Sequence, residues 1–318
     1  MHLLRKLQRP LQIAFGVIAV AFLVYFVARN WGDVAAALGR MNPAWVAASF
    51  VLGLVGNYFQ MLNWRSLVHA FGFGLGVRKA AEMTFIAQIG KYIPGGVWPT
   101  VVASQLGASA GIPASSVAVT MIMQMGVQLT TATVLAVGSL LLVPALAHEY
   151  WWLILLVLVI GVVALLPPVM RRILGVLFGL MRRREHLPEL RGGKLGLSIV
   201  WSLLGYIMWG LHLWLLFGAI DGLSARTFIP SVSGFSLAWA VGFLAVLAPA
   251  GAGVREGILV LLFSGIYGAA VVLGVAVVSR ILLVVVDVVS LCYGLLLRAL
   301  DRRGRPEPAS SAVGPERP

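Results

Sequence analysis

Five charged residues lie in otherwise apolar stretches of the chain: Lys91, Arg255, Glu256, Arg280 and Asp287. A charge at the centre of a membrane helix costs roughly 2.5–3.5 kcal/mol, so each needs a partner or a cavity. Arg280 and Asp287 are seven residues apart, too far for a direct pair along one helix. We therefore expect ion pairs between different segments, joining Arg255 or Arg280 to one of the two acids.

The balance of these charges favours anion binding. Three cations against two carboxylates leave the set net positive, which suits an anion or a zwitterion bound through its phosphate. The cations expected to contact it are Lys91, Arg255 and Arg280. A structural interpretation remains open beside this one, in which the charges are satisfied buried pairs that fix a helix bundle.

Two breaks rich in proline and glycine, at residues 90–99 and 248–257, contain three of these charges. Irregular backbone inside a membrane is tolerated only where protein buries it or it lines a wet cavity. A break also exposes the N–H groups of a helix N-terminus, which favours phosphate. The expected substrate-binding residues are Lys91, Pro94, Gly95, Gly96, Trp98, Pro249, Gly251, Gly253, Arg255, Glu256, Arg280 and Asp287.

The composition indicates an integral membrane protein. Of 318 residues, 60% are hydrophobic and 11% charged, and the mean hydropathy is +0.96, whereas soluble domains carry about 25% charged residues. The net charge of +13 comes largely from clusters beside apolar segments, as the positive-inside bias produces. This argues against a nucleic-acid partner. Cys292 is the only cysteine, which excludes an intramolecular disulfide.

We expect an all-α polytopic fold with about six to eight transmembrane helices and one or two re-entrant broken hairpins. Spans are expected at 11–28, 44–63, 115–143, 151–170 and 195–220, with 64–79 as a cytoplasmic loop. Segments 80–89 and 97–107 are each too short for a hydrocarbon core of about 30 Å, so they form a hairpin entering from the cytoplasm. Residues 1–300 make one domain and 301–318 a disordered cytoplasmic tail; both termini are cytoplasmic.

Two topologies remain for residues 228–297. In one, 228–267 is a hairpin entering from outside and 269–297 is one long span; in the other, three spans fill the region. The first would make the two halves an inverted-topology repeat, in which paired broken segments mark the substrate site.

At these breaks the sequence resembles the flippase-like family typified by the transmembrane region of lysylphosphatidylglycerol synthase. The resemblance covers roughly residues 10–300 and rests on the run from Gly90 to Gly96 with Trp98-Pro99, and on Pro249, Gly251, Gly253, Arg255 and Glu256. It implies a bacterial inner-membrane protein that moves a lipid between leaflets and has anionic membrane lipids as partners. A separate synthase or glycosyltransferase partner is conceivable. Eighteen residues follow Leu300, so we expect no aminoacyl-transfer domain and no synthase activity.

Two other functions stay open: a membrane transferase acting on a lipid-linked substrate, and an anion channel built on paired half-helices. The five histidines are scattered, and no Gly-x-x-x-x-Gly-Lys-Ser/Thr motif for ATP is present. We expect no catalytic residue, no metal and no cofactor. The substrate of the flippase-like function would be an anionic or zwitterionic phospholipid, aminoacylated or not, or a lipid-linked compound.

Overall fold

The computed structural model describes residues 31–93, 97–141, 144–166, 192–245 and 253–303, with single positions between them (28, 168, 169, 172, 175, 176 and 251). Within these ranges every regular element is a helix. The expected first span at 11–28 lies outside the described residues except for its last position.

Five helices in the described part are long and apolar enough to cross a membrane: α3 (Pro43–Ala70), α6 (Ala114–Ala136, continued to Ser139), α9 (Gly192–Asp221), α10 (Phe228–Leu244, with the preceding turn from Ala225) and α12 (Ala269–Arg303). The others are α2 (Trp31–Arg40), α4 (Val77–Gln88), α5 (Trp98–Gly107), α7 (Pro144–Leu165) and α11 (Val254–Tyr267). The prediction of an all-α polytopic membrane protein is confirmed.

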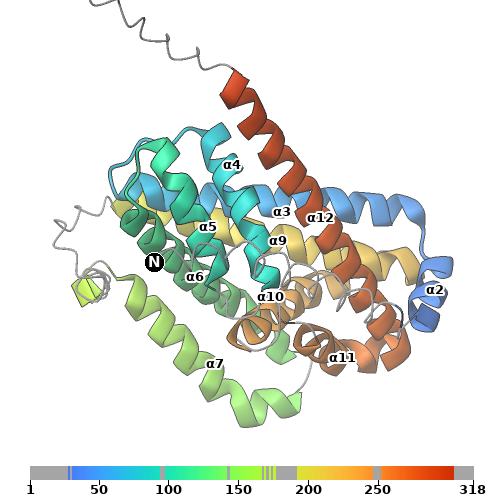
Figure 1. Ribbon diagram of the computed structural model, residues 1–318. Coiled ribbons are helices and arrows are strands. Elements are labelled where there is room, and N and C mark those ends of the chain that lie inside the picture. Colours follow the sequence, from blue (N-terminus) through green and yellow to red (C-terminus); the bar gives the residue numbers. More distant parts are fainter. Residues whose placement is uncertain are drawn as a thin grey trace, which may run out of the picture.

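The most extensive helix–helix contact in the described part of the chain is between α3 and α9, which lie side by side in Figure 1. The backbone N–H of Asn42, at the start of α3, donates to the Ala219 carbonyl near the end of α9 (2.9 Å). At the other end, the Ser198 hydroxyl donates to Asn63 Oδ1 (2.5 Å). The two helices are therefore antiparallel and in contact from one end to the other.

Amides on one face of α3 hold this core together. Gln60 Oε1 accepts from Asn63 (3.1 Å) and from Gln128 of α6 (2.9 Å), while Gln124 donates to the Gln60 carbonyl (2.9 Å). Asn57, Gln60 and Asn63 are all buried. Their three-residue spacing thus serves interhelical hydrogen bonding, which stabilises helix association where water is absent.

The expected end of this span was wrong. We placed 64–79 in a cytoplasmic loop because of its basic residues, but α3 continues to Ala70. Nothing before Gly72, which has φ +84°, stops a helix. Trp64 is fully buried, and Arg65 Nε donates to the Leu75 carbonyl (2.7 Å), so the guanidinium caps the following turn instead of leaving the helix.

The first broken segment consists of two short helices, as predicted. α4 has 12 residues and α5 has 10, or about 18 and 15 Å at 1.5 Å per residue, and neither spans about 30 Å of hydrocarbon. A 3₁₀ turn, η1 (Ile89–Tyr92), extends α4 toward the break. A Cβ on Gly90 would lie 2.8 Å from Pro99 N, so only glycine lets the two arms approach this closely.

The second broken segment consists of α10 and α11, followed by α12. α11 has 14 residues, about 21 Å, and lacks the length for a third span. α12 is one continuous helix of 35 residues. These lengths favour the topology with a single long final span, while α10 itself is long enough to cross.

The same order of elements occurs twice: a long helix, a broken pair and a long helix, first in α3 to α6 and again in α9 to α12. The first arm of each broken pair packs on the last helix of the other half, because α4 packs on α12 and α10 packs on α6. Figure 1 shows α12 crossing the front of the bundle beside α4.

Candidate functional site

The last helix, α12, fastens both broken segments through buried ion pairs. Asp287 pairs with Lys91 of η1, and Arg280 pairs with Glu256 of α11. Arg280 and Asp287 are seven positions apart, about two turns, so both side chains project from one face of α12, about 10.5 Å apart along the axis. α12 therefore positions the two halves of the candidate site.

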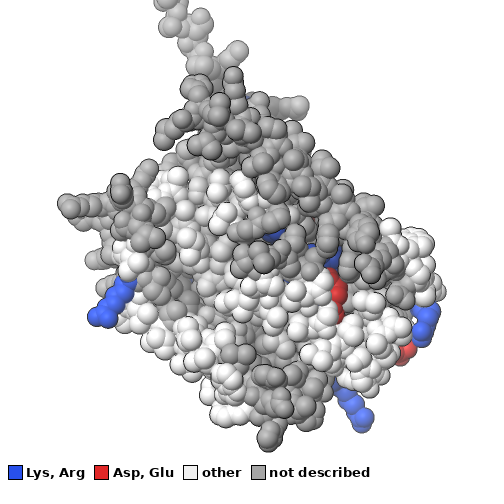
Figure 2. Space-filling model, turned by 60° about the horizontal axis from the view of Figure 1, so that its bottom comes forward, with Lys and Arg blue, Asp and Glu red and all other residues white. Residues whose placement is uncertain are grey.

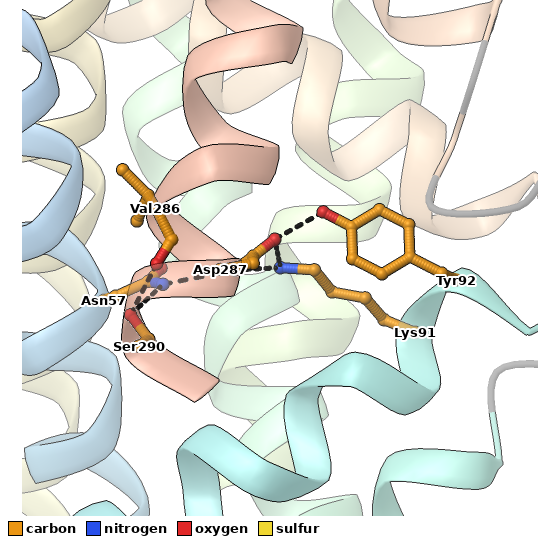
Figure 3. Close-up of polar contacts among 6 residues, drawn as sticks. All are labelled: Asn57, Lys91, Tyr92, Val286, Asp287 and Ser290. Carbon is orange, nitrogen blue, oxygen red and sulfur yellow. Dashed lines mark hydrogen bonds and ion pairs between the residues drawn. The ribbon is translucent and has the colours of Figure 1, made fainter. Parts of the chain in front are cut away.

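Donors from two elements surround the carboxylate of Asp287 (Figure 3). The Lys91 ammonium lies 2.8 Å from Oδ1 and 2.7 Å from Oδ2, and the Tyr92 hydroxyl donates to Oδ2 (2.5 Å). From the opposite side, Asn57 Nδ2 donates to Oδ1 (3.2 Å). The Asp287 side chain is 4% exposed and that of Lys91 is 38% exposed. We call these four residues the Asp287 cluster.

The second pair organises the start of α11. Glu256 Oε2 accepts from the backbone N–H of Gly253 (2.7 Å), and Oε1 lies 3.6 Å from Arg280 Nη1. The carboxylate thus caps the helix N-terminus and neutralises a buried cation at once. Gly253, the N-cap residue, has φ +82°, and Gly251 has φ +71°. Both are backbone conformations that residues with a Cβ rarely adopt.

Arg255 is the cation of this set for which the described residues supply no paired carboxylate. It is half-buried, and its Cζ lies 5.8 Å from the centroid of the Trp239 ring, within reach of a cation–π interaction. The aliphatic part of its side chain packs directly against the backbone of Gly242, because a Cβ on Gly242 would lie 2.6 Å from Arg255 Cγ. Among the described residues it forms no ion pair, and its shielded Nε has no hydrogen-bond partner.

Tyr206, which also contacts the Trp239 ring, carries a second buried polar group without a hydrogen-bond partner among the described residues. The Tyr206 ring meets Trp239 edge to face at 5.2 Å, and its hydroxyl is fully buried without a hydrogen-bond partner among the described residues. Tyr206 and Arg255 interact electrostatically. Buried polar groups left unpaired cost about 1–3 kcal/mol each, and such groups in a native structure point to a function or a bound species.

The two broken segments converge on this region. Tyr92, from the first, interacts electrostatically with Arg255 and Arg280, from the second segment and α12. In Figure 2, acidic and basic side chains lie next to one another among residues of other types on the face shown. The three cations and two carboxylates expected from the sequence therefore belong to one neighbourhood with one positive charge in excess.

The expected pairing is correct for one pair only. Arg280 pairs with Glu256 as expected, but Asp287 pairs with Lys91, where we expected an arginine. The lysine reaches Asp287 because η1 turns the chain back toward α12 before the break. Trp98 begins α5 next to Gly90. Pro94, Gly95, Gly96 and Pro249 lie outside the described residues.

Four residues of the site were not among the expected binding residues: Asn57, Tyr92, Tyr206 and Trp239. Tyr92 follows Lys91 in the break, so its position was a usable signal. Tyr206 and Trp239 stand in largely apolar helices, where an aromatic side chain by itself indicates only packing.

No group of three potential metal ligands occurs in the part of the chain that the structure describes. His212 of α9 is fully buried and bridges Ser49 of α3 (2.6 Å) and Ser279 of α12 (2.9 Å). Its role in this structure is to join three helices.

The fold and site define an α-helical membrane protein with two broken helix pairs that meet at a cationic cluster. The family described as lysylphosphatidylglycerol synthase TM region matches residues 11–290, which is most of the chain, and the protein belongs to this family. A search of curated proteins found no match.

Proposed function

We propose that this protein is a lipid flippase-like transporter, which moves an anionic or zwitterionic phospholipid or lipid-linked compound between leaflets. We place it in a bacterial inner membrane with both termini in the cytoplasm. Its membership in the lysylphosphatidylglycerol synthase TM family supports a lipid substrate. Substrate movement would be downhill, ion-coupled or driven by a partner, because the sequence has no motif for ATP.

The observation that carries the proposal is the state of Arg255. Lys91 and Arg280 each face a carboxylate, whereas Arg255 lies between aromatic and glycine surfaces with its Nε unsatisfied. A phosphate oxygen would supply the hydrogen-bond acceptor that this donor lacks among the described residues. Arginine suits this task because its planar guanidinium binds phosphate through paired hydrogen bonds.

Aromatic and glycine surroundings make this arginine a selective site. The Trp239 face stabilises the guanidinium without neutralising it, and the missing side chains at Gly242 and Gly251 leave it close to bare backbone. A cation held in this way keeps its affinity for an incoming anion, which an ion-paired arginine would not.

The test is a leaflet-exchange assay in proteoliposomes with fluorescent phosphatidylglycerol and phosphatidylcholine. We expect the wild-type protein to move at least one of them faster than protein-free vesicles do. Arg255→Gln should slow exchange by about tenfold or more, because hydrogen bonds to charged groups contribute about 1.5–3 kcal/mol and each 1.4 kcal/mol is tenfold.

The matched control is Arg226→Gln, which removes the same charge from an exposed turn before α10. It should exchange lipid at the wild-type rate. If the folded wild-type protein moves no lipid, or if Arg255→Gln and Arg226→Gln behave alike, the proposal is wrong.

A further inference from the structure

An apolar groove lies between α3, α4 and α12, one helical turn from the Asp287 cluster. Its volume is about 380 Å³, within the range of about 300–1,000 Å³ typical of ligand sites. Its walls are Leu54, Val55 and Tyr58 of α3, Phe85 of α4, and Val289 and Tyr293 of α12. Ser290, which is buried, also lines it.

Close backbone contacts on both sides of the groove set its shape. A Cβ on Gly53 would lie 2.9 Å from Val286 Cγ2, so α3 and α12 touch at that level. Two turns further along α12, a Cβ on Gly294 would lie 3.3 Å from Phe85 Cβ, so α4 and α12 touch there. The groove occupies the stretch between these two contacts. Helix packing, more than side-chain rotamers, therefore keeps it open.

The inner side of the groove is connected to the ion-paired cluster. Asn57 Nδ2 donates to Ser290 Oγ (3.4 Å) and to Asp287 Oδ1 (3.2 Å), as Figure 3 shows. Asp287 and Ser290 are three residues apart on α12, about 4.5 Å along the axis. An apolar surface thus leads directly to a charged one, the pattern that complements a molecule with a hydrocarbon tail and a polar head.

The helices that form the walls also decide what can fill the groove. α3 and α12 are both long and apolar enough to span the membrane, so an opening between them faces hydrocarbon. A free phosphate or other soluble anion gains nothing from apolar walls, whereas burying apolar surface of a chain is favourable in proportion to its area.

We propose that the groove holds an acyl chain of the transported lipid while its headgroup lies at the broken segments. This inference rests on the proposed function and adds to it a lateral entry between α3, α4 and α12. It names the substrate class as a lipid that stays partly in the bilayer, which a channel for soluble anions would not need.

Two valines on α12 provide a matched test. Val289 lines the groove and is 41% exposed, while Val285, one turn away and outside the groove lining, is 42% exposed. Val289→Trp should fill the groove and slow exchange of fluorescent phosphatidylglycerol by about tenfold or more, whereas Val285→Trp should leave it unchanged. Arg255 is unaltered in both variants, and thermal unfolding in detergent checks that each is folded.

A second measurement uses the unmodified protein, so it does not depend on the folding of a variant. Wild-type protein in vesicles of phosphatidylglycerol with a photoreactive group in one acyl chain is irradiated, and the labelled residues are identified by mass spectrometry. Labels should concentrate on the groove residues of α3 and α12 above the level at Val51 and Leu296, two exposed lipid-facing positions on the same helices.

Equal labelling of groove and control positions would overturn the inference, and so would wild-type transport by Val289→Trp. The failure of the proposed function gives a different result, because wild-type protein would then move no lipid at all.

Discussion

Lys91 is the residue whose interpretation changes most at the level of single side chains. Its position in a glycine- and proline-rich break suits an anion-binding cation, but Asp287 neutralises it at 2.7 Å. Arg255 is next to Glu256 in the chain but does not pair with it. The Glu256 carboxylate contacts Arg280 and the N-terminus of α11 instead. This difference is why we propose that the headgroup binds at Arg255 and that the Asp287 cluster holds the helices together in a locking role.

The locking role makes a prediction about stability. Asp287→Asn keeps the shape of the side chain but leaves the Lys91 ammonium without a counter-charge. We expect the free energy of unfolding to fall by about 1–3 kcal/mol, less than the about 3–5 kcal/mol of a fully buried pair, because Lys91 is partly exposed. Thermal unfolding in detergent measures it.

Two further variants separate charge from shape. The double variant Lys91→Met with Asp287→Asn should regain most of the lost stability, since it leaves no unpaired charge. The control is Asp301→Asn, also on α12, which removes an exposed ion pair with Arg78 of α4. It should change the free energy of unfolding by less than about 1 kcal/mol. A single Asp287→Asn variant as stable as wild type would contradict the locking role.

The sequence could predict which charges form the site but only partly how they pair. Lys91, Arg255, Glu256, Arg280 and Asp287 are conspicuous because each interrupts an apolar run. Lys91 and Asp287 are 196 residues apart in the chain, and their contact depends on where α4 packs on α12. Nothing local to either residue encodes that packing.

At the level of helices, the break before α11 depends on its glycines. Gly253 has φ +82°, and a methyl group would meet nothing within 4 Å, so the cost of Gly253→Ala is one of backbone conformation alone. We expect this variant to lose about 1–3 kcal/mol of stability. Thermal unfolding and lipid exchange, measured together, show whether the break carries function as well.

The control for this change is Gly257→Ala, four residues later in the regular part of α11, which also has open space for a methyl group. Alanine is preferred over glycine inside a helix by about 0.5–1 kcal/mol, so this variant should be slightly more stable than wild type. Equal effects at the two positions would show that the backbone conformation of Gly253 is not needed.

Helix existence was easier to predict than helix ends. The short arms α4 and α5 follow from length and from the prolines and glycines between them. The basic residues after Asn63 predict the end of the span there, which is wrong because Arg65 has a backbone carbonyl to bind within the protein. Charge marks where a chain can leave the membrane, while only a backbone signal such as Gly72 marks where a helix stops.

For the molecule as a whole, the arrangement supports the predicted inverted repeat. α3 and α9 occupy corresponding places in the two halves and run antiparallel. The first helix of each broken pair packs on the last helix of the other half. An inverted repeat requires that the two breaks open to opposite sides of the membrane.

This requirement can be tested by labelling. In a Cys292→Ser background, Val97→Cys and Leu244→Cys introduce thiols at exposed positions beside the first and second breaks. A membrane-impermeant maleimide should label the first from the cytoplasmic side and the second from the outside. Labelling of both from one side would exclude the inverted arrangement.

The two ion pairs on α12 have a consequence for how the molecule can move. A single stiff helix holds one broken segment through Asp287 and the other through Arg280, two turns apart. Neither segment can shift along this helix without breaking a pair or displacing its counterpart. If displacement of one break moves α12 and so alters the other ion pair, thermodynamic reciprocity makes that coupling equal in both directions.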